Sequence, residues 1–148
     1  MVGEARINNG RKEHTSFIII DSQSVKNTDT AKNKGYDAGK KVSGIKRHAI
    51  VDSQGLPHGL LVTTANCTDR QGTLKVIREN QETLKQVEVV LVDGGYTGEA
   101  FSSAVQDLIG ARVEVATRSE LHKFAVIPQR RVVARPSAWL EQCRRLWN

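Results

Sequence analysis

Short apolar runs separated by polar turns mark the predicted strands of this chain. Residues 17–21 form an apolar run that ends in an acid, which is typical of a strand buried on both faces. A second strand is predicted at 45–52, and a Ser-Gln-Gly turn at 53–55 leads into a third at 60–64, so this region indicates a hairpin. Residues 87–92 predict another central strand.

Helical spacing of apolar residues indicates three helices. The first is predicted at 70–84, and the second at 97–108, with Thr97 as its N-cap. Gly110 ends the second helix, and residues 112–116 predict a short strand. Pro136 suits the first turn of a last helix. The apolar stripe of that helix consists of Trp139, Leu140, Cys143, Leu146 and Trp147.

Polar segments without periodicity precede and separate these elements. Residues 1–16 predict a flexible N-terminal tail, with order beginning at Phe17. Residues 26–44 predict a loop, and residues 118–131 a basic connection. The remaining chain, 17–148, is predicted to be one domain. Its element order, βββαβαβα, predicts an α/β fold whose mixed sheet is antiparallel on one side, parallel on the other and flanked by helices.

Length and composition support a single domain. The chain has 148 residues, of which 39% are hydrophobic and 26% charged, and this suffices for one core but not comfortably for two. Cys67 and Cys143 lie far apart without partners at metal-ligand spacing, and no N-terminal apolar run resembles a signal peptide or a membrane span. These features predict a soluble protein of a reducing cytoplasm.

Positive charge gathers at the two ends of the chain. The formal net charge is +6: residues 1–60 carry 10 Lys and Arg against 6 Asp and Glu, residues 61–117 carry 5 against 8, and residues 118–148 carry 7 against 2. Basic ends around an acidic middle suit a polyanionic partner, because counterion release favours its binding. A merely solvated basic surface is the alternative interpretation.

Two aspartates stand at the ends of predicted strands. Asp21 ends the first strand and Asp93 follows the fourth, so both carboxylates sit on rigid strand ends. Hard cations such as Mg²⁺ prefer oxygen ligands of this kind. Each aspartate could instead cap a turn, Asp93 at the Gly94-Gly95 bend and Asp21 through nearby backbone amides.

Several spaced motifs follow one another in a fixed order. They are Ile20-Asp21-Ser22-Gln23-Ser24-Val25-Lys26; Gly44-Ile45-Lys46-Arg47-His48 with Val51-Asp52 and Gly55-Leu56-Pro57; Asp93-Gly94-Gly95-Tyr96; and Arg130-Arg131-Val132-Val133 with Ala138-Trp139-Leu140 and Arg144-Arg145-Leu146. Together they resemble bacterial insertion-sequence transposases of the DDE type, and the resemblance covers residues 17–147. It implies a ribonuclease H-like catalytic domain that cuts and joins double-stranded DNA at transposon ends.

The resemblance gives Asp21 and Asp93 catalytic and metal-binding roles. In the family, two aspartates and a glutamate hold Mg²⁺ (or Mn²⁺), and two cations about 3.5–4 Å apart stabilise the attacking and leaving oxygens of the phosphodiester. Asp21 would bridge the metals, and Asp93 would hold one of them. Of the other acids near the motifs, Asp52 and Asp69 are explained by turn positions.

The third catalytic position departs from the family pattern. Ala134 occupies the place of the glutamate, and Pro136-Ser137 replaces a hydroxyl residue and an aromatic. Because alanine supplies no oxygen ligand, we expect an inactive or impaired enzyme. Glu141 lies about 10 Å farther along the predicted helix, too far to substitute. Glu99 and Glu120 stay open as replacements.

Basic residues of the motifs are the candidate DNA contacts. Lys46, Arg47 and His48 open the second strand, and the resemblance implies that they contact DNA phosphate or help to order the site; a solvent-facing basic edge is the alternative. A second group consists of Arg130, Arg135, Arg144 and Arg145. This group could also be only the exposed side of an amphipathic helix. Tyr96, beside Asp93, is predicted to pack beneath the site.

Three functional hypotheses remain at this point. The first is a transposase catalytic domain that lacks the N-terminal DNA-binding region and C-terminal continuation of its family, as in one frame of a split transposase or a decayed fragment. The second is a non-catalytic DNA-binding or interfering remnant, and the third is another ribonuclease H-like nuclease with a differently placed acid. The expected partners are DNA at transposon ends and a second copy or companion transposase fragment, and no membrane. Metal-dependent strand cleavage separates the enzymes from the remnant.

Overall fold

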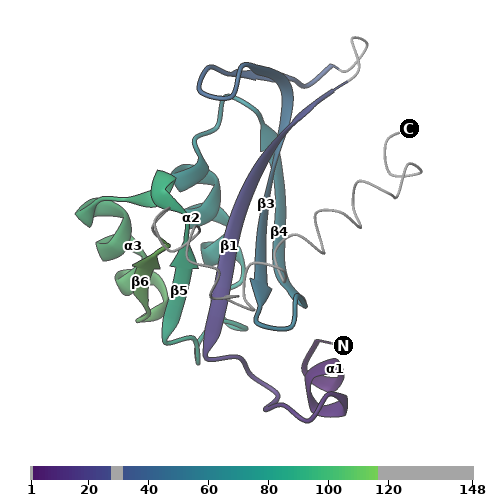
Figure 1. The fold of residues 1–148 in the computed structure, drawn as a ribbon, viewed down its shortest axis with the longest axis vertical. Coiled ribbons are helices and arrows are strands. Elements are labelled where there is room, and N and C mark those ends of the chain that lie inside the picture. The colour runs from purple at the N-terminus through teal and green to yellow at the C-terminus, as the bar shows by residue number, and fades with distance from the viewer. Residues whose placement is uncertain (1, 28–31, 117–148) are drawn as a thin grey trace, which may run out of the picture.

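The computed structural model describes residues 2–27 and 32–116, and in these ranges a curved sheet carries helices on one face (Figure 1). The strands are β1 (Phe17–Lys26), β2 (Gly35–Asp37), β3 (Val42–Asp52), β4 (Pro57–Thr64), β5 (Val89–Val92) and β6 (Arg112–Val115). The helices are α1 (Val2–Asn8), α2 (Asp69–Glu79) and α3 (Glu99–Ile109), and a short 3-10 helix, η1, spans Gly94–Tyr96. None of these helices is long and apolar enough to cross a membrane.

The sheet is mixed, as the element order predicted. Its strands lie in the order β2-β3-β1-β5-β6, and β4 pairs with β3. β1 runs antiparallel to β3, from the pair Ile18↔Asp52 to the pair Lys26↔Gly44. On its other side β1 runs parallel to β5, which in turn runs parallel to β6. β1 is therefore the strand at which the antiparallel part of the sheet meets the parallel part.

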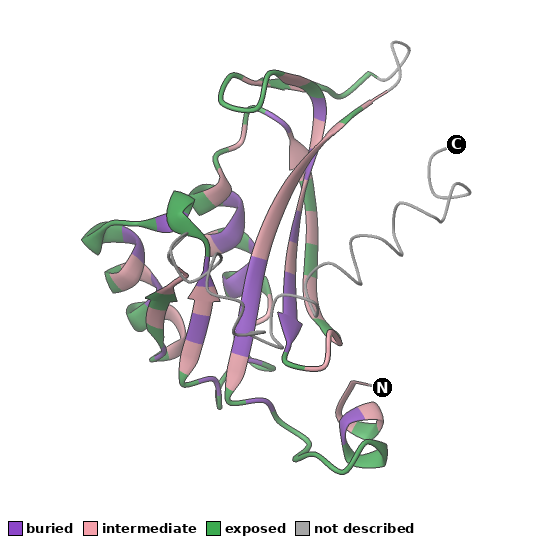
Figure 2. Ribbon diagram, in the orientation of Figure 1, coloured by how far each residue is buried: buried purple, intermediate pink, exposed green. Residues whose placement is uncertain are grey.

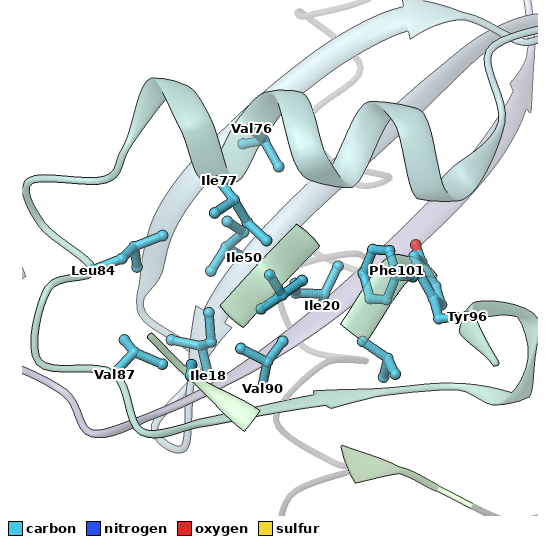
Figure 3. Packing of buried hydrophobic residues seen from close by; sticks show 13 residues of the cluster. Ile18, Ile20, Ile50, Val76, Ile77, Leu84, Val87, Val90, Tyr96 and Phe101 are labelled. Carbon is cyan, nitrogen blue, oxygen red and sulfur yellow. The ribbon is translucent and has the colours of Figure 1, made fainter. Parts of the chain in front are cut away.

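The hydrophobic core lies between the sheet and helices α2 and α3. Alternate strand residues point to this face, and Figure 3 shows Ile18 and Ile20 of β1 packed with Ile50 of β3 and Val90 of β5. The helices add Val76, Ile77, Phe101 and Val105. Burying one such aliphatic or aromatic side chain stabilises the fold by roughly 1.5–3 kcal/mol. Along β1 the buried residues end at Ile20, residues 21–25 are half-buried, and Lys26 is exposed (Figure 2).

Helix ends follow local capping rules, with one correction. Thr68 caps α2, since its side chain accepts a hydrogen bond from the backbone of Gln71 at 3.2 Å. Gly110 ends α3 in the left-handed conformation with φ 71°, as predicted. The predicted N-cap at Thr97 is wrong by one residue, because Gly98, with φ 128°, takes that position. No side-chain hydrogen bond caps α3 there.

Ordered structure begins earlier than the expected Phe17. Residues 2–8 of the predicted tail form α1, and its Arg6 is buried. The Arg6 guanidinium pairs with the carboxylate of Asp52 at the end of β3 and donates to the carbonyl of Lys12 at 2.9 Å. A contact between positions so far apart in the chain holds α1, which local periodicity could not indicate.

The predicted loop at 26–44 is shorter than expected. β1 continues to Lys26 and β3 begins at Val42, and the short strand β2 pairs with the start of β3. The helix predicted to reach residue 84 ends at Glu79. The predicted connection at 118–131 and the last helix, which carries Ala134 at its start, lie outside the described residues.

Candidate active site at the ends of the parallel strands

Asp21 and Asp93 occupy matching positions along neighbouring parallel strands. Asp93 directly follows β5, as predicted, whereas Asp21 lies inside β1 and not at its end, because β1 continues to Lys26. The ladder between β1 and β5 pairs Ile18 with Val90 and Ile19 with Leu91. Continued by two positions, one residue past the end of β5, the same register sets Asp21 opposite Asp93. Parallel strands are spaced about 4.8 Å apart, and equivalent positions project to the same face of the sheet. The fold therefore brings these two predicted catalytic residues together at one sheet edge.

The electrostatics of Asp21 reflect this proximity. Its pKa is raised above the ordinary value of 3.8, first because burial penalises the charged form and second because the Asp93 carboxylate lies nearby. The ammonium group of Lys40 and the backbone amide of Ser22 act in the opposite direction. Two like charges held at one edge are favourable partners for a divalent cation, which relieves their repulsion.

The turn after β5 fixes the Asp93 side chain. Asp93 Oδ1 accepts a hydrogen bond from the Gly95 amide at 2.9 Å, so this aspartate caps η1 as the simpler sequence interpretation proposed. The guanidinium of Arg70, on α2, donates to the carbonyl oxygens of Gly95 and Thr97 and holds the turn against the helix. A capping contact through one oxygen also sets the orientation of the carboxylate.

Lys40 is a site residue that the sequence interpretation missed. Its Nζ donates to the Ser22 carbonyl at 3.0 Å and lies 3.4 Å from Asp69 Oδ2, while 43% of its side chain stays exposed. The following residue, Lys41, has φ 54°, a left-handed conformation uncommon for a residue with a Cβ. This turn therefore brings the Lys40 ammonium group toward Asp21. The sequence predicted only a polar loop for this segment.

The three motif residues Lys46, Arg47 and His48 do not share one face of the sheet. Lys46 and His48 face the core, and Arg47 faces the other side. Lys46 is buried and lies 3.0 Å from Asp37 Oδ2 and 2.7 Å from Asp69 Oδ1. Burial would lower the Lys46 pKa, but hydrogen bonds from the ammonium group to these two carboxylates outweigh it and raise the pKa.

His48 is completely buried, and this burial lowers its pKa to about 4. Its ring and the Lys46 ammonium are thus engaged inside the protein, which favours an ordering role over phosphate contact. Arg47 instead shares the sheet face of Asp21, because the strand pairs Asp21↔Ala49 and Gln23↔Arg47 alternate with those of the buried residues. Its Nη2 donates to Gln23 Oε1 at 2.9 Å.

The other acids near the motifs have partners of their own. Asp52 is fully buried and accepts from the amides of Gln54 and Leu56 at 2.8 and 3.0 Å, which agrees with its predicted turn position. Burial would raise the Asp52 pKa, but hydrogen bonds from His58, these amides and Arg6 hold it at about 2.

Asp69 lies in the first turn of α2 and pairs with Lys40 and Lys46. Its charge also raises the Asp21 pKa slightly. In residues 2–27 and 32–116 no three His, Cys, Asp or Glu side chains are grouped so that they could hold a metal ion, and Glu99 joins no such group. The described part of the site therefore offers two carboxylates, Asp21 and Asp93. Ala134, Glu120 and the basic residues Arg130, Arg135, Arg144 and Arg145 lie outside it.

Tyr96 packs beneath the two aspartates, as predicted. The side chain is buried, and its ring centroid lies 5.2 Å from that of Phe101 (Figure 3). The hydroxyl lies 2.6 Å from Ser22 Oγ and 3.2 Å from Thr73 Oγ1. Burial raises the pKa of Tyr96 to about 12, so the hydroxyl keeps its proton.

Known proteins share both the sequence pattern and the fold. A family model described as the transposase DDE domain matches residues 12–148. The putative transposase for insertion sequence element IS402 of Burkholderia cepacia is 32% identical over 110 residues, which cover 70% of this chain and 52% of that protein. This chain thus spans about half the length of that relative.

A solved structure provides an independent comparison of the fold. A chain in the cryo-EM structure of the simian T-cell lymphotropic virus intasome in complex with PP2A regulatory subunit B56 gamma superposes with a TM-score of 0.57 and 14% identity. The match covers 87% of this chain and 39% of that chain. At this identity the likeness shows the fold alone. Together with the mixed sheet and its helices, it confirms the predicted ribonuclease H-like fold.

Proposed function

This chain belongs to the transposase DDE domain family, and from that premise we propose that it acts at insertion-sequence ends through a metal site built on Asp21 and Asp93. The reaction would be phosphodiester cleavage and strand transfer, dependent on Mg²⁺ or Mn²⁺. The observation that carries the proposal is the parallel register of β1 and β5, which, continued two residues past Ile19↔Leu91, sets Asp21 opposite Asp93. The raised pKa of Asp21, caused by burial and by Asp93, supports it.

The residues at the site fit the chemistry of a hard divalent cation. Asp21 and Asp93 would supply its charged oxygen ligands, and such a cation usually keeps several waters besides one or two carboxylates. When bound, it would stabilise the attacking and leaving oxygens of the phosphodiester. The Gly95 amide orients Asp93 through its hydrogen bond, and η1 fixes the backbone at that position.

Two cationic side chains near the aspartates are the candidate DNA contacts among the described residues. Lys40 lies near Asp21 and 43% of its side chain is exposed, and Arg47 occupies the same sheet face as Asp21. Guanidinium and ammonium groups bind phosphate through charge-assisted hydrogen bonds. We assign phosphate contact to these two residues, and to Arg130, Arg135, Arg144 and Arg145 on the sequence resemblance alone.

Ala134 sets the expected level of activity. The family places a glutamate at this position, and a methyl group supplies no ligand for a second cation. We therefore expect one cation to bind at Asp21 and Asp93 while cleavage is absent or strongly impaired. The same substitution favours the second candidate function, a non-catalytic DNA-binding or interfering remnant, in which the basic surface acts without cleavage.

The test measures Mn²⁺ binding and DNA cleavage in the same variants. Asp21→Asn and Asp93→Asn should each weaken Mn²⁺ binding, measured by electron paramagnetic resonance, whereas Asp107→Asn on the exposed part of α3 should not. Cleavage of a supercoiled plasmid carrying an insertion-sequence end is then followed in Mn²⁺. Mn²⁺ binding that is unchanged in both Asp21→Asn and Asp93→Asn would refute the proposed metal site. Binding that depends on both aspartates, with weak Mn²⁺-dependent cleavage that Asp93→Asn abolishes, supports an impaired enzyme, whereas the same binding with no cleavage above that of Asp93→Asn identifies the non-catalytic candidate.

A further inference from the structure

A continuous chain of side-chain hydrogen bonds crosses the protein beneath the two aspartates. It joins Thr73, Tyr96, Ser22, His48 and Thr63. The successive distances are 3.2 Å between the Thr73 and Tyr96 hydroxyls, 2.6 Å from Tyr96 to Ser22 Oγ, 2.8 Å from Ser22 Oγ to His48 Nδ1, and 3.0 Å from His48 Nε2 to Thr63 Oγ1. Five side chains from α2, η1, β1, β3 and β4 are thereby connected.

Thr63, at one end of this series of hydrogen bonds, and the neutral ring of His48 determine which group donates in each bond. Thr63 Oγ1 donates to the Thr64 carbonyl at 3.2 Å, so it accepts from His48 Nε2. Burial keeps the imidazole neutral at physiological pH, and Nδ1 is then an acceptor for the Ser22 hydroxyl. Ser22 in turn accepts from Tyr96, which accepts from Thr73. The hydroxyls of Tyr96, Ser22 and Thr63 each donate once and accept once, Thr73 donates to Tyr96, and both ring nitrogens of His48 have a partner.

This series of hydrogen bonds includes residues next to both Asp21 and Asp93. Ser22 directly follows Asp21 on β1. Tyr96 closes the turn that begins at Asp93, and its backbone amide donates to the Asp93 carbonyl at 3.2 Å. The single hydrogen bond between Ser22 and Tyr96 therefore bridges the two backbone segments that present the carboxylates. His48 and Thr73 hold the far sides of that bridge.

A buried network of polar side chains stabilises a core less readily than apolar packing does. Burying hydroxyl and imidazole groups requires complete hydrogen bonding, and apolar side chains would fill the same space without that requirement. We propose that Ser22, His48 and Tyr96 are positioning residues that hold the Asp21 and Asp93 carboxylates in a fixed relation to one another. Their relevance to metal binding rests on the function proposed above, whereas the positioning itself does not depend on it.

Amide hydrogen exchange of the metal-free protein tests the positioning. Tyr96→Phe removes one hydroxyl and keeps the ring, and Ser22→Ala removes the adjoining hydroxyl. Ser22→Ala should accelerate exchange of the Tyr96 amide, and Tyr96→Phe that of amides around Ser22, each by about tenfold, since a local opening that costs 1.4 kcal/mol less is ten times as populated. Tyr36→Phe and Ser43→Ala, at exposed positions, are the matched controls. Unchanged exchange of the Tyr96 amide in Ser22→Ala and of the amides around Ser22 in Tyr96→Phe would overturn the proposal.

Mn²⁺ affinity then measures the consequence for the site. Residues that orient metal ligands typically change affinity by about 10–100-fold when replaced, so Tyr96→Phe and Ser22→Ala should weaken binding by about tenfold or more. Val105→Ala, which creates a cavity in the same core away from the site, serves as the control for general loosening. An equal loss of affinity in Val105→Ala would overturn the positioning role. Parent protein that binds no Mn²⁺ through Asp21 and Asp93 would refute the proposed function, and the exchange result would still decide the positioning.

Discussion

Gly72 of α2 lies directly against the imidazole of His48 on β3. A Cβ built on Gly72 would come within 2.1 Å of both Cε1 and Nε2 of the ring. Glycine is an unfavourable residue inside a helix, so this position trades helix propensity for a close approach between helix and sheet. The approach leaves room for the fully buried ring and for its hydrogen bonds to Ser22 and Thr63.

Gly72→Ala should therefore destabilise the protein. Alanine improves helix propensity by up to about 1 kcal/mol, but overpacking a core typically costs about 1–3 kcal/mol, and here the added atom meets a ring that cannot move without breaking hydrogen bonds. Urea denaturation should show a net decrease in the free energy of unfolding of Gly72→Ala. Gly94→Ala, where a Cβ meets nothing within 4 Å, is the control. A stabilised Gly72→Ala protein would show that α2 can shift away from the ring.

His48 should make stability fall in mildly acidic solution. Burial lowers its folded pKa from 6.5 to about 4, so the unfolded chain takes up the proton first as the pH drops. The contribution is fully present above pH 6.5 and is lost between pH 6.5 and about 4, by roughly 3 kcal/mol at 1.36 kcal/mol per pKa unit. Unfolding free energies measured across this range for the parent and His48→Gln should differ in slope. Equal slopes would contradict the assignment.

Arg6→Ala should detach α1 and weaken the whole fold. The change leaves the Asp52 carboxylate buried with only His58 and two backbone amides as partners, and breaking a buried ion pair costs about 3–5 kcal/mol. Because three partners remain, we expect a loss near the lower bound. Thermal unfolding of Arg6→Ala and of Arg11→Ala, an exposed neighbour, provides the comparison. Equal midpoints would show that the ion pair adds nothing.

Ala134→Glu should restore cleavage if the family pattern governs this chain. A metal-bound carboxylate contributes several kcal/mol of transition-state stabilisation through the ion it holds, so Mn²⁺-dependent plasmid cleavage should rise by roughly two to three orders of magnitude. Pro136 and Ser137 also depart from the pattern, and reverting them together with Ala134 should give a larger gain. Robust cleavage by the parent that Asp93→Ala abolishes would show that another acid completes the site.

DNA binding should depend steeply on salt and only weakly on sequence. Each phosphate neutralised by Lys or Arg adds about 0.9 to the negative slope of log affinity against log salt. Lys40→Ala and Arg47→Ala should each reduce that slope by about one, while Arg112→Ala, at the opposite end of the parallel strands, should leave it unchanged. A slope unaffected by either change would place the DNA elsewhere on the protein.

Sequence periodicity located the central strands, because continuous apolar runs such as 17–20 and 89–92 have few alternatives to a buried strand. It also placed Asp93 directly after a strand, as the structure has it. The predicted strand end at Asp21 is wrong, because β1 continues to Lys26, and it is the parallel pairing of β1 with β5 that brings the two aspartates together. Alternation along β3 was an available signal for Lys46 and His48: both share the parity of the apolar Ile50, and the structure buries all three.

Other features could not be predicted, because they arise from contacts distant in sequence. α1 is held by Arg6 against Asp52, and Lys40 reaches the site through a left-handed turn at Lys41. Neither depends on a local pattern of apolar residues. The close approach at Gly72 likewise needs a partner strand that the helix sequence does not specify. Such contacts become visible only when the sheet order is known.

The parallel pairing of β1 with β5 also bears on how the protein folds. Roughly seventy positions separate the two aspartates, so closing this contact costs more chain entropy than the hairpin of β3 and β4 does. Contacts of long sequence separation form slowly, and we expect the antiparallel strands to assemble before β5 joins them. Both carboxylates would then be far apart in any early intermediate. Capacity to bind a divalent ion would arise only as the last central strand is added, and metal titration during refolding would report that step.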